Sequence, residues 1–161
     1  MSEAARARLA KSQAELVRAL VAQGAVPVGF DEKRVHAAAR SLVSKRRQTV
    51  ARVWPSLVRS VGDSYSEAFA NYAQAEPLPA GASGLADGRA FLCWLESQGP
   101  MGDAARLEAM AFDLRYAVTP TGLRARHGFA VKLAKLRETP GLVIAARVPW
   151  LGERWWGIPR K

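Results

Sequence analysis

The amino-acid sequence predicts a mainly α-helical protein, a bundle of five to six helices with a C-terminal β-hairpin packed on it. Apolar residues recur at helical spacing through the first two-thirds of the chain, and turn-forming residues separate these stretches. Alternating and β-branched apolar runs are confined to the last third. We therefore expect a helical domain over residues 1–120, and a β-hairpin with a tryptophan-rich tail over residues 121–161, packed together as one unit.

The size and composition of the chain fit a folded domain. It has 161 residues, of which 49% are hydrophobic, and a single cysteine. A domain of about 150 residues buries a sizeable core without cross-links, and one cysteine excludes an internal disulfide framework. No stretch approaches the roughly 20 apolar residues of a membrane span. The first residues also lack the apolar segment of a secretory signal, so we expect a cytoplasmic protein without membrane contact.

Two long helices are expected first. Residues 2–23 carry leucines and valines at helical spacing, and Gly24 is a typical helix end. Residues 31–53 have Asp31 as a capping residue and an apolar stripe opposite a strongly basic face. The dipeptide Trp54-Pro55 interrupts this pattern, because the residue before a proline is disfavoured in the α conformation. Pro55 suits the first turn of a new short helix.

Three more helical segments follow. Asp63 or Ser64 is expected to cap a helix that reaches about residue 76, and the proline- and glycine-rich residues 77–84 form a loop. Asp87 is predicted to cap a short aromatic helix that stops at Gly99-Pro100. A last helix is predicted from Asp103 to about Val118.

The end of the chain changes to strand patterns. Residues 129–133 alternate with period two, which predicts a strand with one solvated face. The sequence Thr139-Pro140-Gly141 fits a type II turn, and residues 142–148 form a second apolar run, so we expect a hairpin over about 127–148. Because an isolated two-stranded hairpin is marginal in water, this one must pack on the helices, pair with another chain, or do both.

Charge is distributed unevenly along the sequence. The net charge is +10 overall, with +8 in residues 1–60, −5 in residues 61–120 and +7 in residues 121–161. Such asymmetry produces an oriented field that attracts an anionic partner, whether nucleic acid, an acidic peptide or an acidic protein surface.

Motifs for catalysis and metal binding are missing from the sequence. It contains no phosphate loop, dinucleotide fingerprint, nucleophile elbow or metalloprotease pattern. Only His36, His127 and Cys93 offer nitrogen or sulfur ligands, so a metal site would need carboxylates to complete it. We therefore expect a protein that is not an enzyme and holds no cofactor, with a small enzyme lacking a recognisable motif as the weakest alternative.

Two surfaces are candidates for binding. The first is a basic stripe on the helix at 31–53, formed by Arg40, Lys45, Arg46, Arg47 and Arg52. It suits an acidic protein surface or, as the alternative function, the phosphates of DNA. The second is the hairpin with its tail, whose tryptophans either close the core or contact a partner, and whose edge strand suits an extended peptide. Its candidate residues are Arg126, Phe129, Lys132, Lys135, Arg147, Trp150, Arg154, Trp155 and Trp156.

Residues 30–118 resemble the helical domain of the HvfC/BufC-like family, long labelled a DNA-binding domain. The resemblance begins in Lys45-Arg46-Arg47 and continues through Trp54-Pro55, Gly62 and Tyr65. Further matching positions are Phe69, Tyr72, Pro77-Leu78-Pro79, Asp87-Gly88-Arg89-Ala90-Phe91, Trp94-Leu95 and Ala105-Arg106-Leu107-Glu108. After Pro120 the sequence is too short for the winged-helix-like recognition element of the family, and it is similar to the short actinobacterial members.

This resemblance implies a non-catalytic partner protein. Members of the family are partners of multinuclear non-haem iron-dependent oxidases that modify ribosomally made precursor peptides, and the short actinobacterial members accompany, or are fused to, such oxidases. The partner binds the oxidase and helps to recruit the precursor peptide, and the iron belongs to the oxidase. The expected partners of this chain are therefore such an oxidase and its precursor peptide, with nucleic acid as the alternative.

Overall fold

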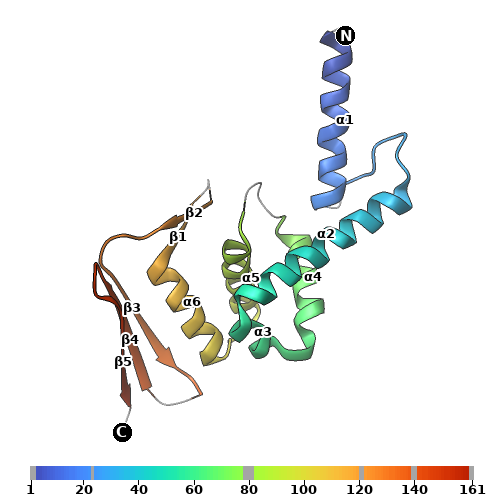
Figure 1. Cartoon of the computed structure of the whole chain (residues 1–161). Helices are drawn as coiled ribbons and strands as arrows, with labels where there is room; N and C mark the ends of the chain where they lie inside the picture. The colour runs from blue at the N-terminus through green and yellow to red at the C-terminus, as the bar shows by residue number, and fades with distance from the viewer. Residues whose placement is uncertain (1–2, 23, 78–81, 120–121, 139–140, 160–161) are drawn as a thin grey trace. The chain divides into compact units, whose positions relative to one another are not determined.

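The computed structural model describes residues 3–22, 24–77, 82–119, 122–138 and 141–159 (Figure 1). The described residues are mostly helical and end in a region of antiparallel strands, as the sequence predicts. The helices are α1 (Glu3–Ala22), α2 (Glu32–Val53), α3 (Pro55–Val61), the short 3-10 helix η1 (Gly62–Ser64), α4 (Tyr65–Ala75), α5 (Gly84–Gln98) and α6 (Asp103–Arg115). The strands are β1 (Tyr116–Thr119), β2 (Gly122–Ala125), β3 (Ala130–Leu136), β4 (Gly141–Val148) and β5 (Gly152–Pro159).

The chain divides into two compact units. Residues 1–49 and 66–79 make unit 1, which contains α1, most of α2 and nearly all of α4. Residues 50–65 and 80–161 make unit 2, which contains α3, α5, α6 and all five described strands. No helix in the described ranges is long and apolar enough to cross a membrane.

Unit 1 has a small aromatic core. Phe69 and Tyr72 on α4 are buried and meet edge to face, with ring centroids 5.5 Å apart. The guanidinium of Arg46 on α2 lies over both rings, 5.7 Å from the Phe69 centroid and 5.4 Å from the Tyr72 centroid. Because a cation over an aromatic face is attracted by the ring quadrupole, Arg46 joins α2 to α4.

Unit 2 is built around Trp54, the residue that separates α2 from α3. Its ring is buried, packs 5.3 Å from the ring of Phe112, and donates from Nε1 to the carbonyl of Leu85 at 3.1 Å. Gly88 on α5 faces the same ring, where a Cβ atom would overlap Trp54. The predicted helix break at Trp54-Pro55 is confirmed, with Pro55 in the first turn of α3.

Both ends of α3 are capped by residues that carry the family resemblance. The Glu108 carboxylate on α6 accepts hydrogen bonds from the backbone N–H groups of Ser56 (3.2 Å) and Leu57 (2.8 Å). A carboxylate at a helix N-terminus satisfies free donors and interacts favourably with the helix dipole. At the other end, Gly62 has φ of 63°, a left-handed conformation that glycine adopts without strain.

The predicted cap of α5 is corrected by the structure. Helix α5 begins at Gly84, inside the segment expected to be a loop, and its N-cap is Ser83, whose side chain accepts from the N–H of Ala86. Asp87 lies within the first turn and is buried. Ser83 takes the capping role because its extended backbone precedes the turn, which places its hydroxyl under the free N–H groups.

The last helix is shorter than predicted, and its first residue has another role. Helix α6 ends at Arg115 rather than near Val118, because Tyr116 already has an extended backbone and pairs with Ala125 in β2. The carboxylate of Asp103 accepts from the backbone N–H groups of Arg137 (2.9 Å) and Glu138 (2.8 Å), which follow β3. The cap position of α6 is Gly102.

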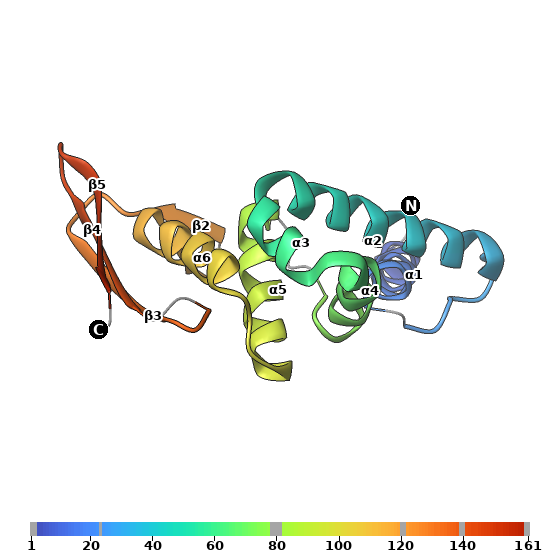
Figure 2. The same ribbon diagram turned by 90° about the horizontal axis from the view of Figure 1, so that it is seen from below.

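The β region is larger than the predicted hairpin. Strands β3, β4 and β5 form an antiparallel sheet in that order, and β1 and β2 pair separately. The tryptophan-rich tail supplies β5, whose pairing with β4 satisfies backbone groups that a two-stranded hairpin would leave open. The sheet stands beside α6, where Met110 and Leu114 pack against Ala134 and Ala145 (Figure 2).

Several predicted local features lie outside the described residues. These are the cap at residue 2, the helix end at residue 23, the centre of the loop at 78–81, and the turn residues 120–121 and 139–140.

Candidate functional site

One face of the three-stranded sheet is an apolar surface with basic corners. Directly paired residues of antiparallel strands share a face, so the register defines which side chains point away from the Ala134 and Ala145 side that packs on α6. We call this opposite side the outer face. Its cross-strand rows are Val131–Ala146–Arg154, Leu133–Ile144–Trp156 and Lys135–Leu142–Ile158.

The outer face exposes large apolar side chains to solvent. Val131 and Leu133 are 68% and 63% exposed, and Trp156 and Ile158 are 50% and 52% exposed. Single exposed apolar residues are common, but a contiguous apolar patch usually marks an interaction site. Lys135 and Arg154 lie at diagonally opposite corners of the patch, so acidic groups on a bound partner would be attracted to both ends of it.

The turn between β4 and β5 presents another tryptophan. Trp150 is fully exposed and has φ of 68°, a left-handed conformation that is strained for a bulky L-residue. The N–H of Leu151 donates to the carbonyl of Val148 at 3.2 Å and closes this turn. Glycine would satisfy the backbone better, so the turn itself does not account for a tryptophan at this position.

The predicted hairpin residues are divided between the two faces of the sheet. Lys135, Arg154 and Trp156 lie on the outer face. The other three strand residues are Lys132, Arg147 and Trp155. They lie on the α6 side, because they share that face with Ala134 and Ala145. Outside β3–β5, Phe129 is exposed before β3, and Arg126 donates from Nε to the carbonyl of Tyr116 at 3.1 Å.

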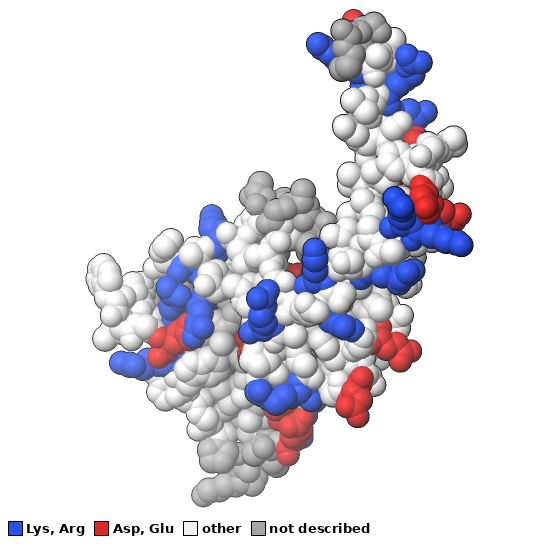
Figure 3. All heavy atoms as spheres, turned by 45° about the vertical axis from the view of Figure 1, so that its right-hand side comes forward, with Lys and Arg blue, Asp and Glu red and all other residues white. Residues whose placement is uncertain are grey.

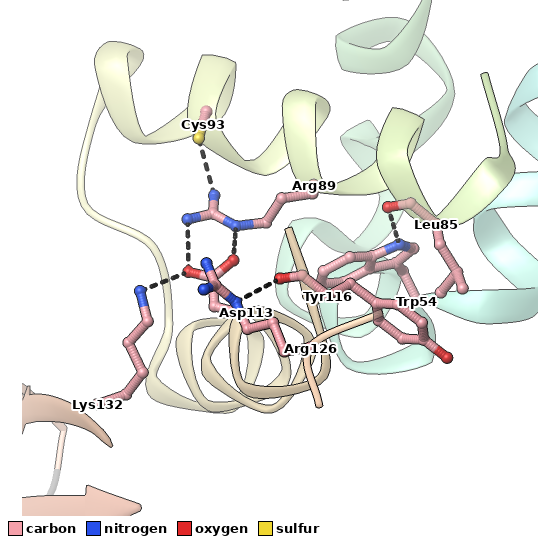
Figure 4. A network of polar contacts seen from close by, with 8 residues as sticks. All are labelled: Trp54, Leu85, Arg89, Cys93, Asp113, Tyr116, Arg126 and Lys132. Carbon is pink, nitrogen blue, oxygen red and sulfur yellow. Dashed lines mark hydrogen bonds and ion pairs between the residues drawn. The ribbon is translucent and has the colours of Figure 1, made fainter. Parts of the chain in front are cut away.

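The α6 side of the sheet contains an ion network (Figure 4). Asp113 on α6 accepts two hydrogen bonds from the guanidinium of Arg89 on α5, at 2.9 and 3.1 Å, and one from Lys132 on β3 at 3.3 Å. Arg89 also reaches the Cys93 sulfur at 2.8 Å. The network joins α5, α6 and β3, and Lys132 is part of it.

The pKa of Asp113 lies below its ordinary value. Burial acts to raise the pKa, but the hydrogen bonds and charge of Arg89, with the charge of Lys132, outweigh it. On the same side of the sheet, Arg115 on α6 holds Glu153 on β5 at 2.5 Å. That hydrogen bond, opposed by burial and aided by the charge of Arg115, lowers the pKa of Glu153. Both carboxylates therefore favour the charged form in the folded protein.

These shifts predict acid sensitivity that one substitution should reduce. A carboxylate with a depressed folded-state pKa stabilises the fold above its unfolded pKa, about 4 for aspartate, and this stabilisation disappears as pH falls through the folded-state pKa. We expect Asp113→Asn to lower the free energy of unfolding at pH 7, with the difference from wild type shrinking towards pH 2 or so. Urea unfolding across this pH range measures it.

The matched control is Asp63→Asn, which removes an exposed carboxylate. It should leave the unfolding free energy and its pH profile close to wild type, because exposed charges contribute little. An Asp113→Asn deficit that stays constant from neutral to acid pH would contradict the ion-pair explanation, since it would show that lost packing alone is responsible.

The basic stripe is partly engaged within unit 1. Arg46 lies over two aromatic rings and donates to the carbonyl of Glu76 at 3.1 Å, and Arg47 donates to the hydroxyl of Ser66. Arg40 and Lys45 are exposed on α2. The fifth residue, Arg52, lies at the end of α2 that belongs to unit 2. Basic side chains are visible on the surface of α1 and α2 in Figure 3.

Sequence reasoning missed most of the outer face. Only basic residues and tryptophans of this face were singled out as candidates. The missed members are Val131, Leu133, Leu142, Ile144, Ala146 and Ile158. A partial signal is the pair of alanines at 130 and 134, on the opposite face from Val131 and Leu133, because small residues suit a sheet face in close contact with a helix.

The described part of the chain offers no group of three or more His, Cys, Asp or Glu side chains placed to hold a metal ion.

Its helices, capping residues and Trp54 core make the described part of the chain a mainly helical fold that ends in antiparallel strands. Residues 10–97 match the family described as "SCO6045-like, C-terminal domain", and the chain belongs to this family. The matched residues run from α1 to α5 and exclude α6 and the strands.

A longer curated relative is the "UPF0276 protein" of Streptomyces avermitilis. It is 44% identical to this chain over 80 residues, which are 50% of this chain and 16% of the relative. This chain therefore corresponds to a small part of that protein's length. No solved structure matches the chain.

Proposed function

We propose that this chain is a non-catalytic partner subunit that binds a multinuclear iron-dependent peptide-modifying oxidase and helps to recruit its ribosomally made precursor peptide. The observation that carries the proposal is the similarity to part of a longer protein. In Streptomyces avermitilis, a segment 44% identical to half of this chain is covalently joined to a much larger remainder.

Covalent linkage keeps two protein segments at high effective concentration, which suits segments that work on each other. Segments that lie on different chains achieve the same association through a non-covalent interface. We propose that this chain has such an interface for a protein related to the remainder of the longer relative. The resemblance of residues 30–118 to the HvfC/BufC-like family supplies the class of that counterpart, an iron-dependent oxidase.

We assign peptide or partner contact to the outer face of the sheet. Among the described strands, β3 and β5 each pair with β4 alone, so each has an edge that an extended peptide can join. Alternate side chains of such a peptide would lie on the apolar rows around Leu133 and Trp156. Lys135 would favour an acidic residue in a peptide on the β3 edge, and Arg154 would do so on the β5 edge.

Trp150 supports a contact function for this end of unit 2. Its ring is fully exposed, so the fold gains nothing from burying it. Its left-handed backbone also opposes a bulky residue, so neither burial nor backbone conformation favours tryptophan there. Tryptophan is enriched among the residues that dominate binding energy at interfaces. Burial of this ring against a partner explains its presence at the turn.

The test of the proposed surface is a charge placed on the outer face. Trp156→Glu should weaken binding to a UPF0276-family protein by about tenfold or more, because it removes an aromatic anchor and introduces a buried charge. Isothermal titration calorimetry measures the affinity, with and without the precursor peptide. Trp156 is half exposed, so we expect circular dichroism of the variant to match wild type.

The matched control is Val28→Glu, which adds the same charge at a fully exposed position in unit 1. It should leave the affinity within about twofold of wild type. Equal weakening by both variants would show that net charge, and not the outer face, determines binding. Unchanged affinity of a folded Trp156→Glu variant would assign the interface to another surface.

A further inference from the structure

Unit 1 contains a groove of about 550 Å³ between the end of α1, one side of α2 and one side of α4. Its floor is made of small or aliphatic residues: Ala19, Ala39, Val43, Ala70 and Ala73. Ala19 and Ala73 are buried, whereas the other three are partly exposed. A floor of alanines leaves open volume above it, so larger aliphatic side chains of a partner have room to enter.

Basic residues form a rim along one side of this groove. His36, Arg40 and Arg47 all line it from α2, with Val43 between them. Their spacing of four, three and four residues puts all four on one helix face, over about 16 Å of helix. Arg47 donates to the Ser66 hydroxyl, and both residues line the groove, so its guanidinium is held at the rim.

This combination restricts the ligand that fits. An apolar floor disfavours phosphate chains, which require polar contacts along their length, although Ser44, Ser66 and Gln74 also line the groove. The three basic groups, one turn and two turns apart, match carboxylates at the same intervals on a helix lying along α2. An amphipathic helix presents aliphatic side chains beside such carboxylates, and binding in an apolar groove is a common mode for helices of this kind.

We propose that the unit 1 groove binds an amphipathic helix of a protein partner, with its aliphatic side chains on the alanine floor and its carboxylates on His36, Arg40 and Arg47. The unit as a whole supports this charge preference, because basic residues outnumber acidic ones in α1 and α2. The inference is independent of the proposed function, because the groove belongs to unit 1 and the outer face belongs to unit 2.

The test uses a synthetic helical peptide of about 18 residues, with leucines on one face and glutamates flanking them. Fluorescence anisotropy with the full chain measures its affinity. Arg40→Glu should weaken binding by about tenfold or more, since it turns an attraction into a repulsion at the centre of the rim. Arg40 is exposed, so the variant is expected to fold.

Lys33→Glu is the matched control, because Lys33 is exposed on α2 and does not line the groove. It should change the affinity by about twofold or less at 0.15 M salt. A second peptide with lysines in place of the glutamates should not bind. Equal losses in the two variants, retained binding in Arg40→Glu, or binding of the lysine peptide would each overturn the proposal. So would duplex DNA that competes with the acidic peptide for the groove.

Discussion

Replacing Gly88 by alanine is expected to destabilise unit 2 by about 3 kcal/mol, the upper part of the usual range for overpacking a core. The added Cβ would overlap Cδ1 and Nε1 of the Trp54 ring, which is buried and has little room to move. A displaced ring would also lose its hydrogen bond to the Leu85 carbonyl and its contact with Phe112. Urea unfolding followed by tryptophan fluorescence measures the loss.

Gly128→Ala is the control for the loss of a glycine. A Cβ at Gly128 meets no atom within 4 Å, and its φ is outside the left-handed region. The control should therefore change the unfolding free energy by about 0.5 kcal/mol or less. A Gly88→Ala variant as stable as Gly128→Ala would contradict the close approach of α5 to Trp54.

The second large effect is expected from Asp103→Ala, which should lower the free energy of unfolding by about 2–3 kcal/mol. The Asp103 carboxylate is buried and accepts the backbone N–H groups of Arg137 and Glu138. The Glu138 carboxylate in turn accepts the N–H of Asp103 at 3.2 Å. Alanine would leave these two N–H donors without their acceptor and would remove the link between the start of α6 and the end of β3. Thermal and urea unfolding measure the loss of stability.

Glu32→Ala controls for charge at a helix start. Glu32 is an exposed acidic residue in the first turn of α2. Its replacement should lower the unfolding free energy by about 0.5 kcal/mol, through the helix dipole alone. Hydrogen exchange separates the two effects: Asp103→Ala should expose the amides of Arg137 and Glu138 in particular. Slow exchange at these amides in the variant would show that another group satisfies them.

The helices were predictable because local chemistry determines them. Pro55 begins α3, and the apolar stripe of residues 31–53 matches α2. The caps were less predictable, since they depend on partners distant in sequence. Glu108 caps α3 from α6, and Asp103 binds residues that follow β3, and no spacing rule indicates either contact.

The sheet shows where pattern reasoning fails. Alternation in residues 129–133 correctly indicated a strand, but period two does not say which face is buried. The aliphatic Val131 and Leu133 face away from α6, whereas small Ala134 packs on it and Lys132 reaches Asp113. The tail was not recognised as a strand because its pairing with β4 is a tertiary event.

The residues that carry the family resemblance have structural roles. Trp54 forms the core of unit 2, Gly62 ends α3, and Glu108 caps its start. They therefore identify the fold and not the binding surface. The outer face consists of other residues, and the unit 1 groove shares only Arg47 with the resemblance, which explains why sequence reasoning located these surfaces only in part.

The most direct test of the central claim is co-expression of this chain with a UPF0276-family protein, followed by size-exclusion chromatography with light scattering and metal analysis. A partner subunit should elute with the larger protein in a fixed stoichiometry, and the iron should remain with the larger protein when the two are separated. Elution of two separate proteins, with and without the precursor peptide, would contradict the account.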